Sequence, residues 1–282
     1  MARKGTVLVA VAALCWGISG GIAGVLLSDG WDAFVVSFFR GVIGLLFVLL
    51  WLALRPGASG LANRKLWFWS VIAGLGVAGN FAFYFLSIMQ SSVAVAATLM
   101  YCAPVFVYLV SFVLKLERST PLKWVAIGMV MLGIVLLTGV YKNDAGGVTL
   151  IGAGAGLLAG LSYAVFIFGF KYAAPHGTPQ AILVIFIWLV EANQVMAVFR
   201  SPSWPLFMLL GVLGAGLSFT LYIIGLHHTA PSVASVVAMV EPVSATLFGV
   251  AVLNESLAGL QIVGMALILI TATVLAFYSS AR

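Results

Sequence analysis

Residues 236–255 read VVAMVEPVSATLFGVAVLNE and place an acid and a proline side by side within an apolar run. Pro242 removes a backbone donor and presses on the carbonyl four residues earlier, at Ala238. A carboxylate such as Glu241 is expensive inside a membrane and is usually functional there. The stretch therefore predicts a membrane helix that bends near its middle and carries one buried acid.

The composition of the 282-residue chain indicates that lipid is the solvent for most of it. Hydrophobic residues make up 63% and charged residues 7%, whereas a soluble domain carries about 25% charged residues. The net charge is +6, and the basic residues are scattered along the sequence. They form no basic patch of the kind that a nucleic-acid-binding protein carries. Cys15 and Cys102 lie in apolar stretches and form neither a metal-binding spacing nor a disulfide framework.

Apolar segments of about 20 residues, the length that crosses a bilayer core, recur along the whole sequence. The basic Arg3-Lys4 start is similar to a signal peptide, but the run that follows is too long for a signal core and is kept as the first helix. The rule predicts ten spans near 6–27, 33–54, 66–89, 92–114, 121–141, 149–171, 178–199, 204–227, 231–253 and 258–279.

The basic residues of the loops between these spans predict the orientation of the chain in the membrane. With the N-terminus on the cytoplasmic side, Lys142 and Arg200 are the only basic loop residues on the outer side. The basic residues that fall inside are Arg3, Lys4, Arg55, Arg64, Lys65, Lys115, Arg118, Lys123, Lys171 and Arg282. Because cytoplasmic loops are rich in Lys and Arg, both termini are expected in the cytoplasm.

The sequence repeats itself when it is shifted by 138 residues. The shift aligns Tyr84 with Tyr222, Pro104 with Pro242, and Glu117 with Glu255. Residues 1–141 and 142–282 are therefore expected to be two five-helix units. Because five is odd, the second unit enters the membrane from the opposite side, an arrangement found in secondary transporters with a substrate site near mid-membrane.

Several motifs carry a resemblance to a known family. They are ALCWGISGG around Trp16-Gly17, Arg40 in FFRG, the stretch from Pro104 to Glu117, and EPVSATLFGVAVLNESLAGLQIVG from Glu241. Together they resemble the EamA-type transporters of the drug/metabolite transporter superfamily over the whole chain. The resemblance implies a carrier of the bacterial inner membrane with ten helices in two inverted repeats. It also implies export of amino acids or other metabolites, aromatic amino acids among them.

Polar and aromatic residues inside the spans are the candidate site. Glu241 could exchange a proton, or it could bond a group freed by the Pro242 bend. The expected substrate pathway comprises Trp16, Asn80, Tyr84, Tyr101, Tyr163, Trp188, Ser218, Tyr222 and Glu241, with Pro104 and Pro242 as bend or gating positions. Core packing is the alternative for the aromatic residues, and hydrogen bonding between helices is the alternative for Asn80 and Ser218.

Two further charged residues lie inside predicted spans. Arg40 could attract an anionic substrate group, although reaching the interface or pairing with Asp29 or Asp32 is the favoured interpretation. Glu191 could meet a substrate amine, pair with Lys171 or lie in a distorted segment.

Other functional classes have weaker sequence support. Gly17–Gly21 matches G-x-S-x-G, but Ser19 lies in an apolar helix rather than a strand–turn–helix, so an intramembrane hydrolase using His227 or His228 is disfavoured. No phosphate-binding loop is present. We expect a carrier without cofactor or metal whose partners are a small solute and the bilayer. A passive channel is the main alternative, and the sequence is compatible with a monomer.

Overall fold

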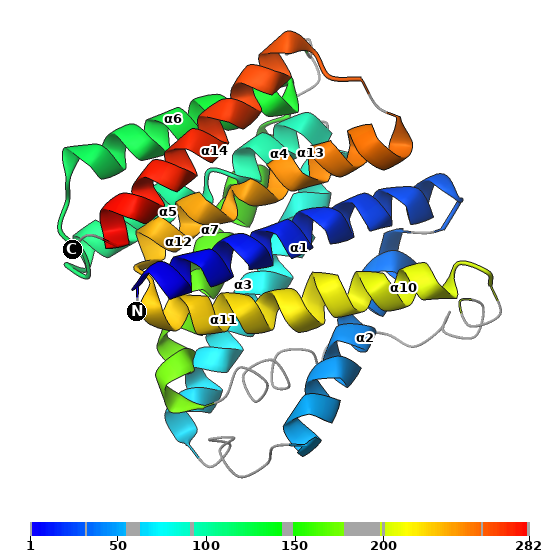
Figure 1. The fold of residues 1–282 in the computed structure, drawn as a ribbon, viewed down its shortest axis with the longest axis horizontal. Helices are drawn as coiled ribbons and strands as arrows, with labels where there is room; N and C mark the ends of the chain where they lie inside the picture. Colours follow the sequence, from blue (N-terminus) through cyan, green and yellow to red (C-terminus); the bar gives the residue numbers. More distant parts are fainter. Residues whose placement is uncertain are drawn as a thin grey trace.

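The chain is built from helices. The computed structural model describes residues 2–31, 33–54, 63–90, 93–142, 149–177, 198, 201–254 and 256–280, and every regular element within them is helical (Figure 1). The first half contains α1 (Ala2–Ser28), α2 (Ala33–Leu54), α3 (Arg64–Met89), α4 (Val93–Met100), α5 (Ala103–Val113), α6 (Pro121–Thr138) and η2 (Val140–Lys142). The second contains α7 (Leu150–Ala173), η4 (Ala174–His176), α10 (Trp204–Gly211), η5 (Val212–Leu217), α11 (Ser218–His228), α12 (Pro231–Ala238), α13 (Val240–Leu253) and α14 (Gly259–Ser280).

Most of these helices can cross a membrane. In the described part of the chain, eight stretches are long and apolar enough: Lys4–Ser28, Arg64–Met89, Val95–Val113, Pro121–Thr138, Leu150–His176, Trp204–His228, Pro231–Leu253 and Gly259–Tyr278. Helix α2 adds the shorter apolar stretch Phe38–Leu50. The expected span at 178–199 lies outside the described residues, apart from Val198. The fold is thus an all-helical membrane protein, while ten crossings and cytoplasmic termini stay predictions.

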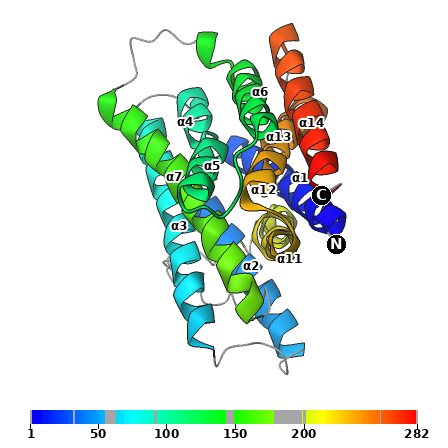
Figure 2. The ribbon, with the colours of Figure 1, turned by 90° about the vertical axis from the view of Figure 1, so that its left-hand side faces the viewer.

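The outer surface of the bundle is apolar. Phe68, Leu75 and Phe277 each keep 60% or more of their surface exposed, and a soluble protein rarely exposes so many large apolar side chains together. Lipid tails are the natural contact for this surface. The start of α1 and the end of α14 lie at the same end of the molecule (Figures 1 and 2).

Two membrane-crossing helices are interrupted near the paired prolines. The chain leaves the α-helix at Tyr101 and Cys102, between α4 and α5, and again at Met239, between α12 and α13. Pro104 lies in the first turn of α5, where its missing N–H costs nothing. Pro242 likewise lies in the first turn of α13. Each interruption therefore places irregular backbone inside the membrane, and such backbone is tolerated only where protein or a cavity surrounds it. A gating role for the prolines stays a prediction.

Helix contacts recur with the two halves of the chain exchanged. Helix α3 packs along α7, and α1 packs along α11. Helices α4 and α5 contact α7, whereas α12 and α13 contact α1. The last helices of the two halves, α6 and α14, lie side by side (Figure 2). Two copies of one five-helix unit would produce this exchange of partners, although division of the chain at residue 141 remains a prediction.

Candidate functional site

A carboxylate at one helix interruption lies among phenols from several helices. Glu241 lies in the first turn of α13, and it interacts electrostatically with Tyr84 of α3, Tyr163 of α7 and Tyr222 of α11. Tyr101, at the other interruption, belongs to the same group of side chains. The two interrupted helices thus face a common centre, which we call the tyrosine cluster: Tyr84, Tyr101, Tyr163, Tyr222 and Glu241.

Several buried polar atoms of the predicted site residues have no hydrogen-bond partner within the described part of the chain. They are Trp16 Nε1, Tyr163 Oη, Ser218 Oγ and Tyr222 Oη, and each side chain is at most 4% exposed. Buried polar groups are almost always hydrogen-bonded to protein or water. Tyr163 and Tyr222 belong to the tyrosine cluster, and Trp16 packs against Tyr222. Their three unsatisfied donors mark a place where water or a polar solute is expected to bind.

Aromatic rings pack beside these donors. The ring of Trp16 lies 4.8 Å from that of Tyr222 and 5.1 Å from that of Phe219, measured between centroids. Tyr163 lies 4.4 Å from Phe166. The ring bodies are thus packed in the core as the alternative interpretation expects, while the polar tips of Trp16, Tyr163 and Tyr222 stay unsatisfied among the described residues. A substrate-pathway role for these residues stays a prediction.

Arg40 turns toward the protein interior rather than toward the membrane surface. Its Nε and Nη2 atoms both donate to the carbonyl of Gly214 at 3.2 Å, and its charge interacts with that of Glu241. Gly214 lies in η5, a π-helical segment, and such segments often occur at functional sites. Snorkelling and pairing with Asp29 are therefore wrong for Arg40, because the η5 carbonyl offers its side chain an interior acceptor, whereas pairing with Asp32 stays a prediction. Asp32 lies outside the described residues.

Two of the remaining residues considered from the sequence make hydrogen bonds between or within helices, and two others lie outside the described residues. Asn80 donates its amide to the Ala159 carbonyl at 3.0 Å, which joins α3 to α7 and favours its helix-packing interpretation. Trp188 and Glu191 lie outside the described residues. Ser19 donates to the Trp16 carbonyl at 2.8 Å, so the hydroxyl of the disfavoured hydrolase reading is engaged in its own helix.

A second polar cluster lies at the end of the molecule where α1 begins. The Glu117 carboxylate, in the α5–α6 connection, accepts the backbone N–H of Ser232 at 3.2 Å, and it also contacts the Ser232 hydroxyl and the Lys123 ammonium. Ser232 is in the first turn of α12, where a helix favours negative charge. Glu117 therefore joins the two halves of the chain. In the sequence, the only signal for Glu117 is its alignment with Glu255 in the second half.

Lys171 holds the neighbouring turn. Its ammonium bonds the carbonyl of Leu226 and that of Thr229, the latter at 2.8 Å. Cations are favoured at the carboxyl end of a helix, and Leu226 lies in the last turn of α11. The α11–α12 turn is thus fixed by Lys171 on one side and Glu117 on the other.

The Glu117 contacts predict a stability that depends on pH. Burial alone would raise the pKa of Glu117, but the bonds from Lys123 and Ser232 outweigh it and lower the pKa below its ordinary value. Because the pKa of Glu117 is lower in the folded than in the unfolded protein, its ionised form stabilises the fold at pH values above the unfolded pKa of about 4.3. This stabilisation is lost as the pH falls through the folded-state pKa. We expect Glu117→Gln to lower the unfolding midpoint at pH 7 by about 2–4 °C. Thermal unfolding followed by tryptophan fluorescence in detergent measures it. A gap between wild type and variant that stays constant from pH 7 down to pH 3 would contradict this assignment.

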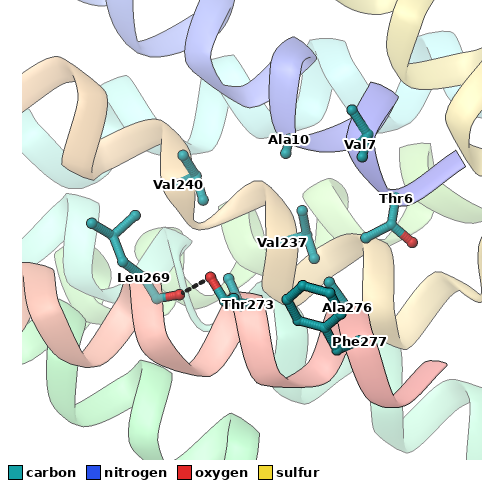
Figure 3. A pocket seen from close by; sticks show the side chains of 10 residues that line it. Thr6, Val7, Ala10, Val237, Val240, Leu269, Thr273, Ala276 and Phe277 are labelled. Atoms are coloured by element: carbon teal, nitrogen blue, oxygen red, sulfur yellow. Dashed lines mark hydrogen bonds between the residues drawn. The ribbon is translucent and has the colours of Figure 1, made fainter. Parts of the chain in front are cut away.

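A cavity of about 230 Å³, lined by none of the tyrosine-cluster residues, lies between α1, the α12–α13 interruption and α14 (Figure 3). Its wall is mostly apolar and includes Val7, Val240 and Phe277. Thr273 Oγ1 at its edge donates to the Leu269 carbonyl at 2.7 Å, within α14. The cavity therefore resembles a lipid-facing recess more than a polar binding site.

Among the described residues, no group of three His, Cys, Asp or Glu could hold a metal ion.

Comparison with known proteins identifies the family. The EamA-like transporter family matches this sequence twice, over residues 3–139 and 150–277. The chain belongs to the EamA-like transporter family.

Relatives of this EamA-like chain are also transporters. An uncharacterised transporter of Archaeoglobus fulgidus is 29% identical over 95% of this chain and 94% of its own. The threonine/homoserine exporter RhtA of Salmonella typhimurium is 28% identical over 70% of this chain and 66% of its own. The uncharacterised inner membrane transporter YicL of the same species is 26% identical over 90% and 89%.

A solved structure supports the fold of this EamA-like protein. One crystal structure superimposes with a TM-score of 0.76 over 98% of each chain, at 21% sequence identity. Together with its apolar helices, the relatives indicate a multi-pass transporter of the bacterial inner membrane.

Proposed function

We propose that this EamA-like protein is a secondary carrier that exports small organic metabolites, foremost amino acids. The observation that carries the proposal is the set of unsatisfied donors on Trp16, Tyr163 and Tyr222 beside Glu241. Zwitterionic solutes with an apolar or hydroxylated side chain offer the charges and acceptors that such a cluster lacks. RhtA, a relative named as a threonine/homoserine exporter, supports the same solute class.

The carrier would work by alternating access between two five-helix units, residues 1–141 and 142–282. Solute would bind between the interruptions of α4–α5 and α12–α13, and the units would rock about it. The exchanged helix contacts described above support this arrangement. Because Glu117 links the two units at one end, its bonds to α12 would open in each cycle.

Flux through liposomes tests the proposal against its alternatives. Full-length protein is reconstituted, and uptake of labelled threonine and phenylalanine is measured with and without unlabelled solute inside. We expect saturable uptake that internal solute accelerates, because a carrier exchanges solute faster than it returns empty. Flux that does not saturate and shows no acceleration would indicate a channel. Peptide cleavage that Ser19→Ala abolishes, without any flux, would indicate a hydrolase.

A further inference from the structure

Arg40 and Glu241, which carry opposite charges, both interact with Tyr101 of the tyrosine cluster but form no ion pair with each other. Arg40 and Glu241 interact electrostatically, yet the only ion pair with an N–O distance within 4.0 Å among the described residues joins Lys123 to Glu117. Both residues are intermediate in exposure, with most of their surface covered by protein. The guanidinium nitrogens of Arg40 and the carboxylate oxygens of Glu241 are therefore more than 4.0 Å apart inside the membrane region.

Each of these charges keeps unused hydrogen-bonding capacity. A guanidinium has five N–H groups, and Arg40 directs only Nε and Nη2 at Gly214. The Glu241 carboxylate accepts no hydrogen bond from the described residues, whereas its backbone carbonyl binds Ser244 Oγ at 2.8 Å. Charges left unpaired in a low-dielectric site are costly, so the separation is expected to be filled when the site is occupied.

The neighbouring groups fit a small zwitterion. Arg40 donates to the Gly214 carbonyl of η5, and η5 continues directly into α11. Ser218 and Tyr222, whose hydroxyls are unsatisfied, lie in α11. The backbone next to Trp16 approaches Glu241, since a Cβ added at Gly17 would lie 2.4 Å from the Glu241 carbonyl. The rings of Trp16 and Tyr222, with centroids 4.8 Å apart, form an aromatic pair beside Glu241.

We infer that Arg40 and Glu241 together recognise the α-amino-acid head group of the transported solute. Arg40 takes the carboxylate, for which its planar fork is suited, and Glu241 takes the ammonium. The aromatic pair of Trp16 and Tyr222 takes the side chain. This inference rests on the proposed amino-acid export and adds which residue reads which charge.

Ligands that lack one charge test the assignment. Dissociation constants are measured on purified full-length protein in detergent, by ligand titration of tryptophan fluorescence, for threonine, 1-aminopropan-2-ol and 3-hydroxybutyrate. The second ligand lacks the carboxylate and the third lacks the ammonium. A parallel set uses phenylalanine, phenethylamine and 3-phenylpropionate. Because each preference is a ratio within one preparation, a reduced folded fraction does not alter it.

The two substitutions should affect different preferences. We expect Arg40→Gln to reduce the preference for threonine over 1-aminopropan-2-ol about tenfold or more, and to leave the preference over 3-hydroxybutyrate unchanged. Glu241→Gln should do the reverse. The control Thr273→Val, whose hydroxyl bonds only within α14, should change neither ratio.

The outcomes separate this inference from the proposed function. If wild type binds and transports amino acids but both substitutions change both ratios equally, or neither, Arg40 is only a clamp on Gly214 and the inference is wrong while export stands. A folded variant that binds none of the ligands also contradicts it. If wild type transports no amino acid, both proposals are wrong.

Discussion

Among the glycines of the described residues, Gly17 is the one whose replacement by alanine is expected to disrupt the protein most. A Cβ at this position would lie 1.8 Å from Ser244 Oγ, 2.4 Å from the Glu241 carbonyl oxygen and 2.7 Å from the Ala245 nitrogen. The Ser244 side chain can rotate, but the two backbone atoms can move only with α13. Small residues permit such close helix approach in membranes, and added volume in a packed interface costs about 1–3 kcal/mol or more.

The same helix provides a matched control. A Cβ at Gly20, three residues further along α1, would meet its nearest neighbour, Ala245 Cβ, at 4.0 Å, which is ordinary contact. Gly20→Ala should therefore keep or slightly raise stability, since alanine favours helix. Monodisperse yield and unfolding midpoint of the two variants in detergent measure the difference. Equal yields and midpoints would show that α1 and α13 are not in the close contact described.

The helical membrane class and the approximate positions of the helix interruptions could be predicted from the sequence. The composition excludes a soluble fold, and proline cannot donate a backbone hydrogen bond, so Pro104 and Pro242 pointed to the regions where α4–α5 and α12–α13 separate. Alignment of the two halves also selected Tyr84 and Tyr222, which the fold brings toward Glu241.

Other features depended on contacts between distant segments. The inward direction of Arg40 requires the freed carbonyl of Gly214, and nothing in the hydrophobic pattern distinguishes a π-helical turn from an α-helical one. Its only sequence signal is the run of small residues Gly214–Gly216. The Glu117–Ser232 bond joins residues 115 positions apart. Repetition of the glutamate at residue 255 hinted at a role without showing a partner.

Glu241→Gln is expected to reduce transport at least about tenfold, because it removes the one carboxylate of the tyrosine cluster while preserving its size. The acid has no counterpart in the first half of the chain, where Ala103 occupies the aligned position. Initial rates of labelled amino-acid uptake into liposomes, normalised to incorporated protein, measure the loss. Asp29→Asn, which removes an acid from the α1–α2 turn, should transport at the wild-type rate.

An imposed pH gradient then separates the two roles considered for Glu241. If the carboxylate exchanges a proton during the cycle, the gradient drives accumulation in wild type, and the amide variant equilibrates its solute without accumulating it. If the carboxylate acts only through ammonium recognition, wild type and variant respond to the gradient in the same proportion, although their rates differ. Normal transport by Glu241→Gln at every pH would exclude both roles and would leave Glu241 as a structural residue at the α12–α13 interruption.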